Sequence, residues 1–163
     1  ERALPESERT EENMLKIRED FVAYYAEHKA DFTAPYDGIC ELLRELKRRG
    51  MLLAVASNKY HSATVALIPE YFGEGLFDFV YGQRDGVPIK PDPTIVFDIM
   101  KEAGVTQDEV LYVGDSGVDM QTAVNSGVAS VGVTWGFRDR EELLKNGASY
   151  IADQPWEIVK FID

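Results

Sequence analysis

The sequence predicts an α/β protein in which a parallel sheet is covered by helices on both faces. From residue 51 onward, short apolar runs of strand-like composition alternate with segments whose apolar residues recur every three or four positions. The run at residues 51–56 is apolar throughout, which is typical of a strand buried on both faces of a sheet. The expected strands are residues 51–56, 77–82, 110–113, 129–134 and 148–152.

Helices are expected before and between these strands. Residues 6–30 have the apolar spacing of one amphipathic helix, and acidic residues crowd its start, where the helix dipole favours them. Residues 39–49 form a second helical pattern that ends at Gly50. Its last turn carries three basic residues, which we interpret as helix-terminal charges facing water. The other expected helices are residues 60–70, 94–103 and 138–146, one that follows Asp119, and a closing helix capped by Asp153.

Composition excludes several classes of function. The net charge of −12 argues against non-specific binding to nucleic acid or to an anionic membrane. No apolar run reaches the roughly 18 residues that span a bilayer, and residues 1–6 lack the basic start of a signal peptide. The single cysteine, Cys40, rules out an internal disulfide and lies in an apolar helical pattern. These features favour a cytoplasmic protein.

The strand predicted at residues 110–113 ends in a pair of carboxylates. Gly114 lets the backbone turn, and Asp115 and Asp119 follow four residues apart. Ligands of open α/β sheets bind at the carboxyl ends of the strands, and paired carboxylates there suit Mg²⁺, which prefers oxygen ligands. Taken one at a time, Asp115 could instead cap the next helix, and Asp119 could be a solvated acid in its first turn.

Two further strand ends carry polar groups that can converge on the same edge. Ser57 and Asn58 follow an apolar run and offer a hydroxyl and backbone donors. Lys90 lies in a loop at residues 83–93, and Pro91 directly after it stiffens the backbone, although an ordinary surface lysine is the alternative. Hydrogen-bond donors, a cation and a metal ion together stabilise charge on a transferring phosphoryl group. Dinucleotide-binding, P-loop and esterase motifs do not occur.

Three of these segments, in this order, resemble the second, third and fourth motifs of the haloacid dehalogenase superfamily. They are Ala56-Ser57-Asn58-Lys59, Lys90-Pro91-Asp92-Pro93 and Gly114-Asp115-Ser116-Gly117-Val118-Asp119. Within the superfamily they are most similar to the phosphoglycolate phosphatase group. The resemblance covers nearly the whole chain and implies a Rossmann-like core of three layers, with a parallel sheet between helices.

The resemblance also implies a role for each site residue. Ser57 would hydrogen-bond a phosphate oxygen, with the backbone of Asn58 beside it. Lys90 would pair with the phosphate and with the nucleophile. Asp115 would bind Mg²⁺ directly, and Asp119 would support the metal site through water or would orient Lys90. Lys90, Asp115 and Asp119 are thus the expected catalytic residues, and Ser57, Asn58 and Lys90 the expected phosphate-binding residues.

The first motif of the superfamily, Asp-x-Asp-x-Thr or Val, which supplies the nucleophile, has no match in the sequence. We therefore interpret residues 1–34 as the last part of a helical cap and residues 35–163 as a core that lacks its first strand. That strand would lie between the strands that end near Ser57 and Asp115. Its absence would leave unpaired strand edges, so we expect the 163 residues to be unstable as a solitary monomer. A missing N-terminal segment or a second protomer would complete the sheet.

The expected function is that of a Mg²⁺-dependent phosphomonoesterase, as part of a longer parent chain, acting on a small phosphorylated metabolite such as 2-phosphoglycolate. An upstream aspartate would be phosphorylated and then hydrolysed, so the fragment alone is expected to be inactive. Other chemistries on the same scaffold are a phosphomutase, a pyrophosphatase or a nucleotidase. A non-catalytic remnant that binds phosphate or a partner is the alternative from another class. The sequence gives neither the substrate nor the oligomeric state.

Overall fold

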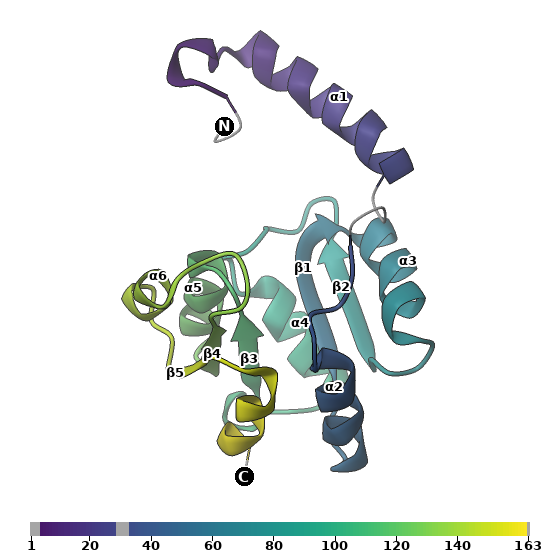
Figure 1. The fold of residues 1–163 in the computed structure, drawn as a ribbon, viewed down its shortest axis with the longest axis vertical. Coiled ribbons are helices and arrows are strands. Elements are labelled where there is room, and N and C mark those ends of the chain that lie inside the picture. Colours follow the sequence, from purple (N-terminus) through teal and green to yellow (C-terminus); the bar gives the residue numbers. More distant parts are fainter. Residues whose placement is uncertain (1–3, 29–32, 163) are drawn as a thin grey trace. The chain divides into compact units, whose positions relative to one another are not determined.

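A computed structural model describes residues 4–28 and 33–162 (Figure 1). The chain divides into two compact units, Glu1–Pro35 and Tyr36–Asp163. The predicted boundary between cap remnant and core, after residue 34, lies next to this division. The assignment of the first unit to a cap remains a prediction.

The first unit contains one long helix, α1 (Glu11–His28), preceded by a short 3-10 turn, η1 (Glu6–Glu8). The prediction of a single helix from residue 6 is therefore wrong at its start. The Thr10 hydroxyl accepts a hydrogen bond from the backbone N–H of Asn13 at 3.2 Å, the kind of contact that begins a helix. Residues 29–30, the predicted end, lie outside the described residues.

Within residues 36–162 the second unit has five strands, and each strand pair is parallel (Figure 1). They are β1 (Ala54–Tyr60), β2 (Phe79–Gln83), β3 (Leu111–Gly114), β4 (Ala129–Val133) and β5 (Tyr150–Ala152). β1 pairs with β2, and the other three strands form a sheet in the order β3-β4-β5. The parallel arrangement is confirmed, but the strands form two sheets. Within residues 36–162, no strand pairs with both β1 and β3, which are the neighbours between which the sequence predicts a missing strand.

The position of β1 corrects a prediction. The strand begins at Ala54, because residues 50 and 51 complete the end of the preceding helix through hydrogen bonds to Lys47 and Leu46. Met51 is exposed, so residues 51–56 are not a strand buried on both faces. Regular pairing with β2 ends at Ala56, and the register shifts before Tyr60. The bounds of the other predicted strands differ by two residues or fewer.

Helices cover both faces of these strands. They are α2 (Ile39–Arg48), α3 (His61–Phe72), α4 (Thr94–Ala103), α5 (Gly117–Ser126) and α6 (Arg140–Lys145), with 3-10 helices η2 (Gln107–Glu109) and η3 (Pro155–Phe161). The closing element is therefore a 3-10 helix. Its cap is Gln154 and not Asp153, whose carboxylate instead binds Thr134 and Arg140.

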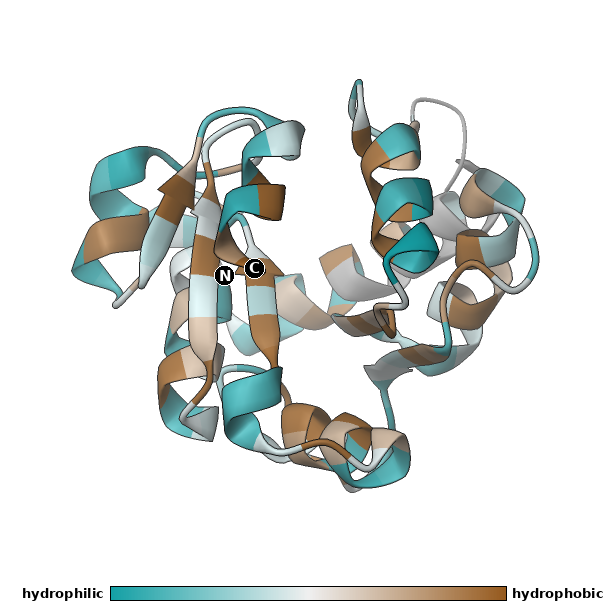
Figure 2. Ribbon diagram, turned by 90° about the horizontal axis from the view of Figure 1, so that it is seen from below, coloured by the Kyte–Doolittle hydropathy of each residue, from teal (hydrophilic) through white to brown (hydrophobic). Residues whose placement is uncertain are grey.

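Two apolar clusters hold the layers together. One joins α2 and η3 to β4 and β5 through Leu42, Val131 and Ile158. The other joins α4 and α5 to β3. Successive side chains of a strand point to opposite faces, so Leu111 packs on the first cluster and Tyr112 belongs to the second. The α/β class and its three layers are thus confirmed, and Figure 2 shows the hydrophobic strands between the helices.

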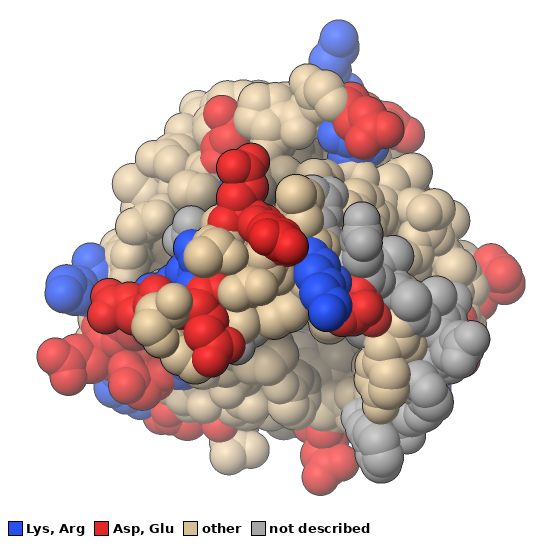
Figure 3. All heavy atoms as spheres, turned by 90° about the horizontal axis from the view of Figure 1, so that it is seen from above, with Lys and Arg blue, Asp and Glu red and all other residues tan. Residues whose placement is uncertain are grey.

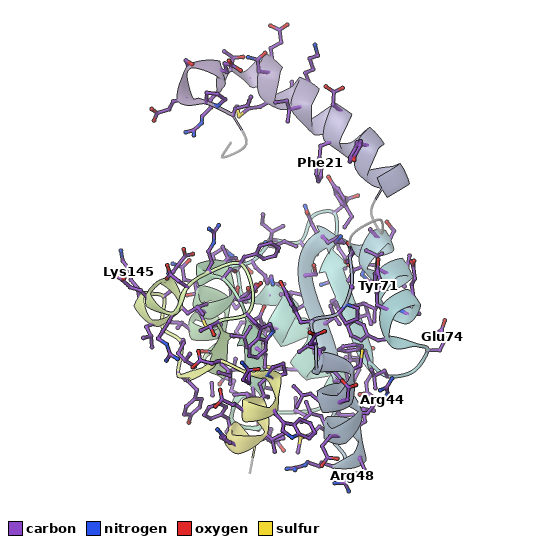
Figure 4. The ribbon with its side chains drawn as sticks, viewed as in Figure 1. Phe21, Arg44, Arg48, Tyr71, Glu74 and Lys145 are labelled. Carbon is purple, nitrogen blue, oxygen red and sulfur yellow. The ribbon has the colours of Figure 1, made fainter. Side chains whose placement is uncertain are left out.

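The three basic residues at the end of α2 are structural. Lys47 pairs with Asp78 at 2.8 Å, and Arg48 and Arg49 both pair with Glu45. Hydrogen bonds from the two arginines lower the pKa of Glu45 to about 2. Figure 4 shows Arg48 pointing away from the strands, as expected of a helix-terminal charge facing water.

Adjacent leucines of α6 give a direct test of this packing. Leu143 is fully buried, whereas Leu144 is 53% exposed. We expect Leu143→Ala to lower the free energy of unfolding by about 2–5 kcal/mol, because it leaves a cavity against β4. Leu144→Ala, the matched control, should change it by less than about 0.5 kcal/mol. Urea denaturation of the protein that carries this chain measures both, and equal effects would contradict the packing described.

Candidate functional site

The ammonium group of Lys90 connects the two sheets. Lys90 Nζ donates hydrogen bonds to the carbonyl of Ala56 at 2.8 Å, to Asp119 Oδ1 at 2.7 Å and to the Tyr112 hydroxyl at 3.1 Å. Ala56 belongs to β1, Tyr112 to β3 and Asp119 to the first turn of α5. The side chain is 10% exposed, which excludes an ordinary surface lysine. The predicted convergence of strand ends is therefore present at this residue.

The main chain around Lys90 is held from both sides. Asn58 forms a pair of hydrogen bonds with it, accepting from the Lys90 N–H at 2.9 Å and donating to the Lys90 carbonyl at 3.1 Å. Asn125, near the end of α5, donates to the carbonyl of Pro91 at 2.8 Å. The loop is thus fixed to β1 and to α5. The sequence predicts a role for the backbone of Asn58 and misses these contacts of its side chain.

Asp119 is buried beside Lys90, with 9% of the residue exposed. Its Oδ1 accepts from Lys90, and its Oδ2 accepts from the Ser116 hydroxyl at 2.6 Å. Ser116, and neither aspartate, is the N-cap of α5. Gly114 is required here, because a Cβ at this position would lie 2.2 Å from the Cβ of Asp119.

Charge pairing outweighs burial at this centre. Burial disfavours the ionised carboxylate, but the charge and hydrogen bond of Lys90, with the bond from Ser116, place the pKa of Asp119 below its usual value. Burial likewise disfavours the ammonium, but the Tyr112 oxygen and Asp119 raise the pKa of Lys90. Burial raises the pKa of Tyr112. At neutral pH the centre is therefore an ion pair bridged by a neutral phenol.

Asp115 lies directly after β3 and is held by the loop that follows β4. The backbone N–H of Phe137 donates to Asp115 Oδ2 at 3.1 Å. Gly136 makes this approach possible, since a Cβ there would lie 2.3 Å from Asp115 Oδ2. Trp135 packs against the first apolar cluster, whereas the Phe137 side chain is 82% exposed. Of the two aromatic residues in this loop, only Trp135 therefore packs into the fold.

Ser57 is half-buried where regular pairing of β1 ends. Its hydroxyl oxygen accepts from the backbone N–H of Lys59 at 3.1 Å. The hydroxyl proton can therefore still be donated to another acceptor. This is compatible with the predicted contact to a phosphate oxygen, which remains a prediction.

The donor set is compatible with Mg²⁺, for which Asp115 would be the direct ligand. Within residues 4–28 and 33–162, no group of three or more His, Cys, Asp and Glu side chains could enclose a metal. Mg²⁺ commonly uses only one or two carboxylates together with water and substrate phosphate. Asp115 Oδ1 accepts none of the hydrogen bonds found among the described residues, whereas both oxygens of Asp119 are engaged. Of its two predicted roles, Asp119 fits the orientation of Lys90 better.

Comparison with known proteins assigns the family. The sequence profile of the haloacid dehalogenase-like hydrolases matches residues 2–133. The chain is 33% identical over 135 residues to the phosphoglycolate phosphatase of Pseudomonas savastanoi pv. phaseolicola. The aligned residues make up 83% of this chain and 49% of that protein. The chain therefore belongs to the haloacid dehalogenase-like hydrolases.

Two further relatives support the assignment. The chain is 29% identical over 157 residues to the N-acetylmuramic acid 6-phosphate phosphatase of Pseudomonas aeruginosa, covering 90% of this chain and 66% of that one. A solved structure from Lactobacillus delbrueckii subsp. bulgaricus, provisionally named a phosphoglycolate phosphatase, has a TM-score of 0.91 and 38% identity. It covers 98% of this chain, which in turn spans 66% of that structure.

Acidic side chains are prominent on the face shown in Figure 3, as expected from the net charge of −12. Among the described residues, every helix is too short or too polar to cross a membrane.

The ion pair predicts a pH window of stability. Because the pKa of Asp119 is lowered in the folded state, its carboxylate contributes to the free energy of unfolding, and this contribution is lost as pH falls through a value below about 3.9. Because the pKa of Lys90 is raised in the folded state, its ammonium contributes to the free energy of unfolding, and this contribution is lost as pH rises through a value above about 10.4. Between these limits we expect Lys90→Met to lower the free energy of unfolding by on the order of 3 kcal/mol.

Urea denaturation at a series of pH values measures this difference. Lys145→Met removes an exposed ammonium and is the matched control, with little effect at any pH. A penalty for Lys90→Met that grows as the solution is acidified below about pH 3.9 would contradict the ion pair.

Proposed function

We propose that the protein carrying this chain hydrolyses phosphate monoesters of small metabolites with the help of Mg²⁺. The observation that carries the proposal is the buried Lys90 ammonium, held between β1 and α5 at the carboxyl ends of the strands. A fixed positive charge beside a carboxylate that can take a metal is suited to a phosphoryl group, whose transfer depends on positioning and charge stabilisation.

Each residue has a distinct part in this proposal. Ser57 donates a hydrogen bond from its hydroxyl group to a phosphate oxygen. Lys90 offsets negative charge on the phosphate, and Asp119 fixes the direction in which its ammonium points. Asp115 would hold Mg²⁺, which when bound supplies further positive charge against the phosphate oxygens. The loop at residues 134–137 keeps Asp115 in place through the Phe137 N–H.

The nucleophile would come from a segment outside this chain, in which the Asp-x-Asp motif has no match. The chain spans about half the length of the first curated relative it matches, which is compatible with a longer parent. The same missing motif favours the second candidate, a non-catalytic remnant that binds phosphate. Against it stands the site itself, in which Lys90, Asp115 and Asp119 all keep structured surroundings.

Two substrates follow from the relatives, 2-phosphoglycolate and N-acetylmuramic acid 6-phosphate. We favour the first, because the similarity to phosphoglycolate phosphatases extends to both sequence and structure. Both compounds present a phosphate monoester to the site, so the chemistry proposed is the same.

Hydrolysis of para-nitrophenyl phosphate by the protein that carries this chain tests the proposal. We expect activity to require Mg²⁺ and to be lost with a chelator. Asp115→Asn should lower kcat/KM by at least about 100-fold, because an amide is a poorer ligand for a hard cation. The control is Asp37→Asn, at an exposed aspartate in the turn before α2. Activity that survives the chelator or Asp115→Asn would refute the assignment.

A second prediction concerns the loop at residues 134–137. Gly136→Ala places a methyl group against the Asp115 carboxylate, so we expect a higher Mg²⁺ concentration for half-maximal activity and a lower kcat. Gly132→Ala controls for loss of stability, because its Cβ would meet Ile151, Leu143 and Ala148 instead. An unchanged Mg²⁺ requirement in Gly136→Ala would show that the loop does not position Asp115.

A further inference from the structure

Tyr112 is a site residue that the sequence motifs do not indicate. In the sequence it stands inside the apolar run at residues 110–113. In the structure its hydroxyl oxygen accepts from Lys90 Nζ at 3.1 Å, and its O–H faces Asp119 Oδ1 at 3.4 Å. The phenol therefore lies between the two charged groups and touches both.

The ring of Tyr112 is fixed by packing. The residue is 9% exposed and belongs to the apolar cluster formed by α4 and α5 on β3. Its neighbours in that cluster are Ile95, Val96, Ala123 and Val128. Because β3 and the packed ring fix the direction of the C–O bond, the hydroxyl is a rigid acceptor for the more flexible lysine.

The ammonium of Lys90 has three protons and three acceptors. The carbonyl of Ala56 and the carboxylate of Asp119 take two of them, and the Tyr112 hydroxyl takes the third. A lysine side chain has four rotatable bonds, so its Nζ atom is placed only as well as its partners restrict it. With the hydroxyl removed, two contacts remain and the third N–H loses its partner in a mostly buried site.

We propose that Tyr112 is a positioning residue, whose hydroxyl fixes the Lys90 ammonium relative to Asp119 so that its positive charge lies beside a phosphate group. This inference rests on the proposed function for its catalytic consequence. The hydroxyl itself touches no reacting atom. Its effect on rate would come through the position of Lys90, and small misplacements of such a charge lower the rate strongly.

Tyr112→Phe tests the proposal, since it removes the hydroxyl and keeps the packed ring. Tyr81→Phe is the matched control, because Tyr81 lies on β2 in the other sheet and its hydroxyl binds Glu102 of α4. The first measurement is acetylation of Lys90 by an N-hydroxysuccinimide ester, quantified by peptide mass spectrometry. Lys145, which projects outward from α6 (Figure 4), is the internal reference.

We expect Lys90 to be acetylated several-fold faster, relative to Lys145, in Tyr112→Phe than in the unmodified protein, with no change in Tyr81→Phe. The second measurement is steady-state hydrolysis of para-nitrophenyl phosphate. Tyr112→Phe should lower kcat by roughly 10- to 100-fold and leave KM within about twofold. A purely structural role for Tyr112 would not produce this split between kcat and KM.

Three results would overturn the proposal. Unchanged acetylation of Lys90 in Tyr112→Phe would show that the hydroxyl does not hold the ammonium. Equal acceleration in Tyr81→Phe would show general loosening of the fold. Faster acetylation with an unchanged kcat would show that the position of Lys90 does not limit turnover. If the unmodified protein hydrolyses no phosphate monoester, the proposed function fails and acetylation alone decides whether Tyr112 positions Lys90.

Discussion

The buried ion pair between Lys90 and Asp119 is the interaction on which the rest of the site depends. Taking an ammonium and a carboxylate out of water is costly unless both are fully hydrogen-bonded. The carbonyl of Ala56, the hydroxyl of Ser116 and the phenol of Tyr112 supply the remaining contacts. These partners come from β1, β3 and the start of α5, so the requirement to satisfy two charges fixes how those elements meet.

The same requirement accounts for the surroundings of the pair. Asn58 and Asn125 hold the main chain of Lys90 and Pro91, which places the lysine stem where its ammonium reaches Asp119. Gly114 lets the backbone of β3 pass close to Asp119. None of these residues carries a net charge, yet each restricts the geometry of the two that do. The site is therefore set by neutral hydrogen bonds and close packing as much as by its charged groups.

Much of this arrangement could be predicted from the sequence, because alternating strand and helix patterns and the order of the three motifs are local features. The helix Thr94–Ala103 was predicted to the residue. The apolar pattern places the start of β1 too early because it includes Leu53. Leu53 packs in the first apolar cluster before the strand begins, and composition does not distinguish a packed loop residue from a strand residue. Tyr112, Asn125 and Gly136 escaped notice because their roles arise from contacts between distant segments. A tyrosine in a strand, an asparagine on a helix surface and a glycine in a turn are all common, so the residue types alone do not indicate a functional site.

The loop at residues 134–137 has a consequence for how this surface can vary among related sequences. Its contact with Asp115 is made by the backbone N–H of Phe137, while the Phe137 side chain points into solvent. Any residue at position 137 except proline retains that N–H, whereas position 136 accepts only glycine without displacing the carboxylate. Side-chain identity beside Asp115 can thus diverge without altering the placement of its carboxylate. Two neighbouring positions are therefore subject to opposite selective constraints.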